Sequence, residues 1–204
     1  PGDRAKALSS ALKDHLRLIV LDLDASDEPQ AIFETLNAHG TPLLPADLIK
    51  NWLLWEGTRQ SLKTDELYLK HWRQFDREIN HWRALTGVGH AARARVDTFL
   101  ANWLTRQVHE PIPAKHLYDR FLRHVEKGGA RTEDGKLAVN ALMASISEDA
   151  TRFRAIEEPD GKTRFHVFLR RLKVIDIVVF HPLLLELMGR PGSDDDDRDN
   201  AAVA

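Results

Sequence analysis

The densest group of polar side chains in this sequence lies around a short connection between two apolar helical segments. Its members are Asn37, Gly40, Asp47, Lys50 and Asn51. Helix positions three and four apart share a face, so Asp47 can reach both Lys50 and Asn51. Buried charges are costly unless they are paired. The cluster must therefore either clamp the turn, with Gly40 at a positive φ, or face a functional cleft.

A second candidate is the basic and aromatic segment 70–95, in which the triplet His-Trp-Arg occurs twice, at His71 and at His81. Cations beside exposed aromatic rings would suit contact with nucleic-acid phosphates and stacking on bases. The cations that would make that contact are Lys70, Arg73, Arg77, Arg83, Arg93 and Arg95.

The aromatic residues of this segment also fit a simpler interpretation, which we favour. Trp72, Phe75, Ile79 and Trp82 follow helical spacing, which predicts that they belong to a hydrophobic core flanked by a solvated basic face.

No complete catalytic or metal-binding motif is present. The sequence has no cysteine, no His-Glu-x-x-His, no phosphate-binding G-x-x-x-x-G-K-[ST] and no G-x-S-x-G. Asp22 and Asp24 stand where a metal-binding pair could lie, but two alternating aspartates ahead of a helix are more typical of caps. We therefore assign no catalytic residue, no metal ligand and no cofactor to these 204 residues.

The elements that must position these side chains are mainly helices, because apolar residues recur at three-to-four spacing between Pro and Gly breaks. We expect a multi-helix bundle with one short strand at 18–23, unless that stretch is a buried helix end. Segment 46–56 is apolar around most of its circumference and should lie in the core. Gly87 to Gly89 reads as a flexible loop. The expected helices are 4–16, 30–38, 46–56, 63–80, 92–108, 115–126, 137–156, 164–179 and 183–188.

Composition agrees with one globular domain, or two small ones, in the cytoplasm. Apolar residues make up 43% and charged residues 29% of the chain, and no apolar run approaches the ~20 residues that span a bilayer. The net charge is −2, but the stretch from Ser193 onward carries −4, so the rest is weakly basic. We divide the chain into a signature region (1–57), a helical bundle (58–192) and an acidic helix start or linker (193–204).

The stretch 31–51, AIFETLNAHGTPLLPADLIKN, resembles the signature FE.LN..G..L...DLIKN of GmrSD-type modification-dependent restriction endonucleases, in their N-terminal domain. Weaker similarity continues through 72–75, 99–104, 117–121 and 168–185, so the resemblance covers nearly the whole chain. It includes Asn37, Gly40, Asp47, Lys50 and Asn51, but it does not fix their roles.

The resemblance implies a role in antiphage defence. In that family a ParB-like unit with an Asp-Gly-Gln-Gln-Arg motif is tied to nucleotide hydrolysis or nuclease activity, and an HNH-type nuclease domain follows. Both are absent here, and the chain begins at Pro1 without an initiator methionine. We therefore expect a piece of a restriction protein, inactive alone, that supports the nucleotide or DNA site and transmits its state to an HNH-type nuclease domain or subunit.

The parent protein would act on modified DNA with a nucleoside triphosphate and a divalent metal, and it could be a homo-oligomer. Two alternatives remain open. The chain could be a non-enzymatic helical interaction module, or it could bind DNA directly through segment 70–95.

Overall fold

The computed structural model describes residues 2–15, 43–87, 92–129 and 131–190, and within these ranges the protein is mainly α-helical. The chain divides into two compact units, Pro1–Thr41 and Pro42–Ala204. The strand expected at 18–23, the helix expected at 30–38, and Asn37 and Gly40 lie outside the described residues. So does the acidic segment 193–204.

The described part of the first unit is helix α1 (Gly2–His15), close to the predicted 4–16. Asp3 in the first turn and Lys13 in the last turn both suit the helix dipole. Ser10 Oγ donates a hydrogen bond to Asp14 at 2.7 Å. Leu8 and Leu12 are both exposed.

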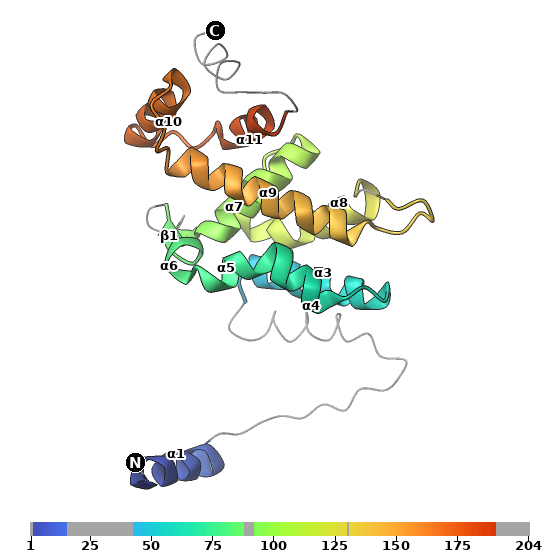
Figure 1. The fold of residues 1–204 in the computed structure, drawn as a ribbon, viewed down its shortest axis with the longest axis vertical. Helices are drawn as coiled ribbons and strands as arrows, with labels where there is room; N and C mark the ends of the chain where they lie inside the picture. The colour runs from blue at the N-terminus through green and yellow to red at the C-terminus, as the bar shows by residue number, and fades with distance from the viewer. Residues whose placement is uncertain (1, 16–42, 88–91, 130, 191–204) are drawn as a thin grey trace. The chain divides into compact units, whose positions relative to one another are not determined.

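The second unit is built around helices α7 and α9, which pack against each other. Helices α3 and α8 contact this pair on one side, and α11 contacts both α7 and α9 on another (Figure 1). No described helix is both long and apolar enough to cross a membrane. The helices are α3 (Pro45–Arg59), α4 (Thr64–Leu67), the π-helical turn η1 (Tyr68–Trp72), α5 (Arg73–Arg77), α6 (Ile79–Trp82), α7 (Arg95–Val108), the 3-10 turn η3 (Ala114–His116), α8 (Leu117–Lys127), α9 (Val139–Glu157), α10 (Arg164–Val174) and α11 (His181–Gly189).

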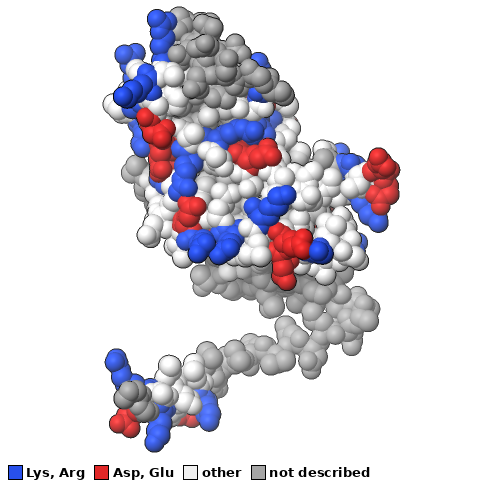
Figure 2. All heavy atoms as spheres, viewed as in Figure 1, with Lys and Arg blue, Asp and Glu red and all other residues white. Residues whose placement is uncertain are grey.

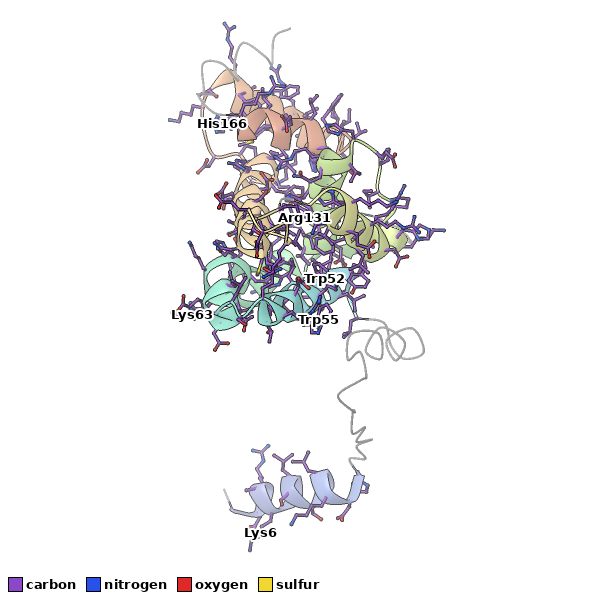
Figure 3. The ribbon with its side chains drawn as sticks, turned by 90° about the vertical axis from the view of Figure 1, so that its right-hand side faces the viewer. Lys6, Trp52, Trp55, Lys63, Arg131 and His166 are labelled. Atoms are coloured by element: carbon purple, nitrogen blue, oxygen red, sulfur yellow. The ribbon has the colours of Figure 1, made fainter. Side chains whose placement is uncertain are left out.

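Helix α3 carries the described part of the signature. It begins at Pro45. Proline suits this position, because the first N–H groups of a helix have no hydrogen-bond partner within the helix. Leu48, Ile49 and Leu53 are buried, whereas both tryptophans of the helix, Trp52 and Trp55, are only half-buried (Figure 3). Trp52 meets Phe121 of α8 edge-on at 5.7 Å, and the Arg59 guanidinium lies 4.9 Å from the Trp55 ring centre. The prediction of a helix inside the core is therefore only partly right.

Segment 63–80 is not the single helix that the sequence predicts. Helices α4, η1 and α5 run on from one another, but the chain leaves helical geometry at Glu78, with ψ of 57°, before α6 begins. The π-helical turn and this break change which face points inward. Trp72, Phe75 and Trp82 are buried as predicted, but Ile79 is 59% exposed. The assignment of Ile79 to the core was therefore wrong.

The core between α5, α6, α7 and α9 is a continuous set of aromatic rings. The Phe75 ring lies 4.9 Å from Trp82 and 5.9 Å from Phe99, and Phe99 lies 5.4 Å from Phe153 of α9. The three contacts are edge-on, stacked and tilted, respectively, and aromatic pairs of this kind stabilise the core beyond the area they bury. They fix α6 and α7 together on either side of a hairpin.

The sequence did not predict that hairpin, because it placed a flexible loop at Gly87 to Gly89 and began a helix at Ala92, whereas α7 begins at Arg95. Strands β1 (Leu85–Thr86) and β2 (Arg93–Ala94) pair antiparallel, with Leu85 opposite Ala94 and Thr86 opposite Arg93. Two residues per strand leave too little alternation for a sequence pattern to reveal.

Helix α10 also ends earlier than predicted, at Val174 rather than Val179. Asp176 then takes a left-handed backbone conformation, with φ of 53°, and the chain turns into α11. This turn leaves Val174 and Val179 exposed.

Candidate functional site

The two charged signature residues on α3 belong to an ion-pair network with the segment that follows. Arg83 binds the Asp47 carboxylate with both terminal nitrogens, at 3.0 and 2.8 Å, and one of them also donates to Asp76 at 3.1 Å. Lys50 Nζ donates to the other oxygen of Asp76 at 2.9 Å and lies 3.4 Å from Asp47. We call Asp47, Lys50, Asp76 and Arg83 the α3 network.

The α3 network is partly shielded from water, since its side chains are 19% to 23% exposed. Burial opposes ionisation of Asp47, but the hydrogen bonds and charges of Arg83 and Lys50 outweigh it and lower the Asp47 pKa. The hydrogen bond to Asp47 is the largest cause that raises the Arg83 pKa, and burial opposes it. Asp47 and Arg83 are therefore charged at neutral pH, and the α3 network pairs two acidic with two basic side chains.

A third acidic residue, Asp97 of α7, caps α3 from outside the helix. The Ala46 N–H in the first turn of α3 donates to Asp97 Oδ1 at 2.9 Å, whereas Leu44, at the N-cap position, offers no side-chain bond. Asp97 is buried, and burial raises its pKa to about 6, against the opposing hydrogen bond from Ala46. The beginning of α3 is thus held by Asp97 as well as by the α3 network.

Of the signature residues, the structure brings together Asp47 and Lys50, as their spacing predicts. Asn51 is half-buried on α3 but lies outside the α3 network. Asp47 and Lys50 clamp α3 to the segment 73–83, whereas the predicted clamp of the turn at Gly40 involves residues outside the described ranges.

The six cations predicted for nucleic-acid contact have different surroundings. Lys70, Arg73 and Arg77 are exposed. Arg83 belongs to the α3 network, and the Arg95 Nε lies 2.8 Å from Glu157 Oε2. Arg93, half-buried on β2, also interacts within the protein.

The tryptophans of the two His-Trp-Arg triplets are unavailable for base stacking. Trp72 and Trp82 are each 1% exposed, in agreement with the core interpretation. Any contact of this face with nucleic acid would therefore rest on its cations and not on its rings.

Two residues of the site, Asp76 and Asp97, were missed from the sequence. Asp76 stands among the basic residues of segment 70–95. Its pairing with Lys50 spans 26 positions, and that of Asp97 with Ala46 spans 51. The one signal for Asp97 was the absence of a polar N-cap residue at Leu44 ahead of Pro45.

The α3 network is suited to holding α3 in place against the segment 73–83. Two carboxylates and two cations compensate one another, and the three hydrogen-bond donors of the ammonium and the fork of the guanidinium fix their geometry. Within the described ranges, no three His, Asp or Glu side chains come together to hold a metal ion. Comparison of the chain with protein-family models, with curated proteins and with solved structures gives no match.

Proposed function

We propose that this chain is the helical coupling module of a GmrSD-like, modification-dependent restriction protein. In this role it supports the nucleotide or DNA site and passes its state on to a nuclease domain or subunit of HNH type. The observation that carries the proposal is the α3 network, because the charged residues of the restriction-family signature, Asp47 and Lys50, are the ones that bind α3 to Asp76 and Arg83.

The proposed mechanism is mechanical. A shift of the signature segment would move α3, whose beginning is held by Asp97 and by the α3 network. Helix α3 also contacts α7, α8 and α9, so its movement would reach the centre of the unit. Nucleotide hydrolysis and cleavage of modified DNA, with a nucleoside triphosphate and a divalent metal, would be performed by other parts of the parent protein.

Two observations test this proposal, and the first is genetic. The reading frame that encodes this chain should also encode an Asp-Gly-Gln-Gln-Arg motif before Pro1 and a nuclease domain after Ala204. A frame that encodes neither would remove the restriction proposal and leave the interaction module as the better account.

The second is a phage-restriction assay with the parent protein. Asp47→Asn and Arg83→Gln should reduce restriction of phage with modified DNA, and phage with unmodified DNA should be unaffected throughout. Glu66→Gln is the matched control, because Glu66 forms an exposed ion pair with Lys63. Protein levels and thermal unfolding must show that the variants still fold. Full restriction by folded Asp47→Asn and Arg83→Gln proteins would contradict a coupling role.

Direct DNA binding has less support. On the face drawn in Figure 2, basic and acidic side chains of the second unit lie next to one another, without a broad patch of one sign. Titration of a labelled duplex at two salt concentrations separates the alternatives, because phosphate contacts make affinity fall with salt. Salt-dependent binding that Arg73→Gln and Arg77→Gln weaken would favour the DNA-binding alternative.

A further inference from the structure

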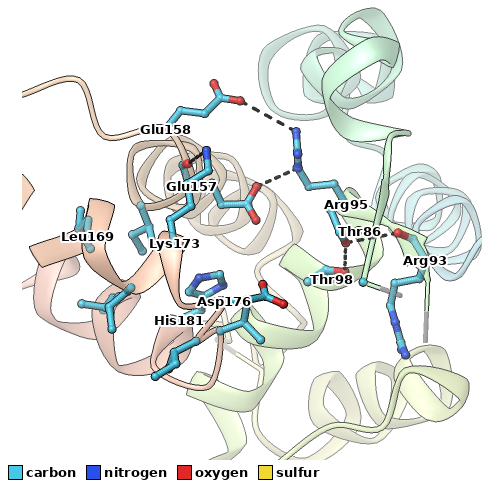
Figure 4. A pocket seen from close by; sticks show the side chains of 16 residues that line it. Thr86, Arg93, Arg95, Thr98, Glu157, Glu158, Leu169, Lys173, Asp176 and His181 are labelled. Carbon is cyan, nitrogen blue, oxygen red and sulfur yellow. Dashed lines mark hydrogen bonds and ion pairs between the residues drawn. The ribbon is translucent and has the colours of Figure 1, made fainter. Parts of the chain in front are cut away.

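A cavity of about 470 Å³ lies among the start of α7, the end of α9, helices α10 and α11, and the β1–β2 hairpin (Figure 4). Its volume falls within the ~300–1,000 Å³ of pockets that hold small molecules. It shares no residue with the α3 network. The cavity is therefore separate from the α3 network.

One wall of the cavity is apolar and comes from consecutive parts of the chain. Leu169 and Leu172 belong to α10, Ile177 and Val178 to the turn after it, and Leu184 to α11. The opposite wall carries the hydroxyls of Thr86 and Thr98, which lie 2.9 Å apart and hydrogen bond to each other. An apolar wall facing a few fixed polar groups is the usual composition of a ligand site.

The cationic side chains of the lining are engaged within the protein. Arg95 Nε lies 2.8 Å from Glu157 Oε2, close but without hydrogen-bond alignment, and its Nη1 lies 4.0 Å from Glu158. Lys173 Nζ donates to the Glu157 carbonyl at 2.8 Å, and Arg93 also interacts within the protein. Since the basic groups already have partners, the lining does not call for an anionic ligand.

Besides the Arg95–Glu157 ion pair, whose Nε and Oε2 atoms make no aligned hydrogen bond, His181 is a buried polar side chain of the lining with an unpartnered atom. It is 8% exposed, its ring meets Phe153 edge-on at 5.3 Å, and Nδ1 has no hydrogen-bond partner among the described residues. Figure 4 shows its imidazole on the α10–α11 side, across from Arg93, Arg95 and Thr98. Burial lowers the His181 pKa to about 4, so the ring is neutral at pH 7. A neutral imidazole offers one donor and one acceptor.

We propose that this cavity binds an uncharged, largely apolar molecule of the size of a fused heteroaromatic ring, which donates a hydrogen bond to Nδ1 of His181. The ring lies against the leucines of α10 and α11, and the hydrogen bond sets its orientation. This bond satisfies a buried polar atom that is otherwise costly to leave unpaired. The proposal goes beyond the coupling role and does not depend on it.

Indole and 1-methylindole are suitable probes, because they differ only in the hydrogen-bond donor and one methyl group. We expect indole to bind the wild-type chain in a calorimetric titration and to shift the imidazole nitrogen resonances of His181. A net hydrogen bond of about 0.5–1.5 kcal/mol predicts an affinity roughly 2- to 12-fold higher for indole than for 1-methylindole. His181→Phe should remove that difference. Equal affinities for the two probes in the wild type would overturn the assignment of His181.

A matched pair of variants tests the location. Val178 lines the cavity and is 54% exposed, whereas its neighbour Val179 is 74% exposed and does not line it. Val178→Trp should block indole binding, and Val179→Trp should leave it unchanged. In the wild type, nuclear Overhauser effects should connect indole to the methyl groups of Leu169 and Leu172. Absence of these effects, or unchanged indole affinity in a folded Val178→Trp chain, would overturn the site.

Discussion

The guanidinium of Arg106, near the end of α7, binds the fully buried carboxylate of Asp149 in α9 with both terminal nitrogens, at 3.2 and 2.5 Å. Arg106 also donates to the Leu185 carbonyl of α11 at 3.4 Å, and Arg152 donates to the same carboxylate at 2.6 Å. Burial raises the Asp149 pKa, and the two arginines oppose that rise. This contact joins the three helices at the centre of the second unit.

We predict that Arg106→Met is strongly destabilising, because it leaves a buried carboxylate with Arg152 as its remaining cation. Loss of one partner of a buried ion pair costs about 3–5 kcal/mol. The double variant Arg106→Met with Asp149→Leu should lose less, because no unpaired charge is then buried. Urea unfolding measures both. Arg190→Met, in an exposed pair with Glu186, is the control. The prediction would be contradicted if the stability loss of the double variant equalled the sum of the losses of Arg106→Met and Asp149→Leu.

The α3 network should also stabilise the protein. Asp47→Asn removes the charge that binds Arg83 twice, and hydrogen bonds to charged groups contribute about 1.5–3 kcal/mol to stability. Glu66→Gln, in an exposed ion pair, should cost less than about 1 kcal/mol. Thermal unfolding of the two variants compares them directly. Equal midpoints would show that Asp47 is not a clamp.

Asp97 should make the protein less stable as pH rises. Its folded pKa of about 6 lies above the ordinary 3.8, so the folded state holds a proton that the unfolded state has lost between these values. The stabilisation of the folded state by the Asp97 proton is fully present below pH 3.8. It is lost as pH rises through 6, which lowers the free energy of unfolding by about 3 kcal/mol. Asp97→Asn keeps an oxygen for the Ala46 N–H and lacks this loss. Urea unfolding between pH 4 and 7 should therefore give different slopes for wild type and variant, and parallel slopes would refute the assignment.

His181 should act in the opposite direction. Its folded pKa of about 4 lies below the ordinary 6.5, so the unfolded state takes up a proton first as the solution is acidified. Stability from the neutral ring is present above pH 6.5 and is lost as pH falls through 4, by about 3 kcal/mol. His181→Phe should keep this stability at acidic pH. The measurement is the same pH series, and a variant that loses stability on acidification as steeply as the wild type would contradict it.

Much of the helical framework could be predicted from the sequence, because periodicity is a local property. The spacing of apolar residues indicated the helices of the second unit, and Trp72, Phe75 and Trp82 proved to be core residues. Asp47 and Lys50 share a helix face by position alone, and the structure places them 3.4 Å apart. The prediction that Ile79 is buried was wrong, because the non-helical backbone at Glu78 interrupts the helical periodicity ahead of Ile79.

The sequence by itself determined most of the helical segments of the second unit and the burial of Trp72, Phe75 and Trp82. Only the tertiary structure decided that Asp76 and Arg83 complete the α3 network, that Asp97 caps α3, and that His181 lines a cavity. These relationships join residues far apart in the chain. They depend on how helices pack against one another, and that arrangement follows from the fit of many side chains together rather than from any local pattern.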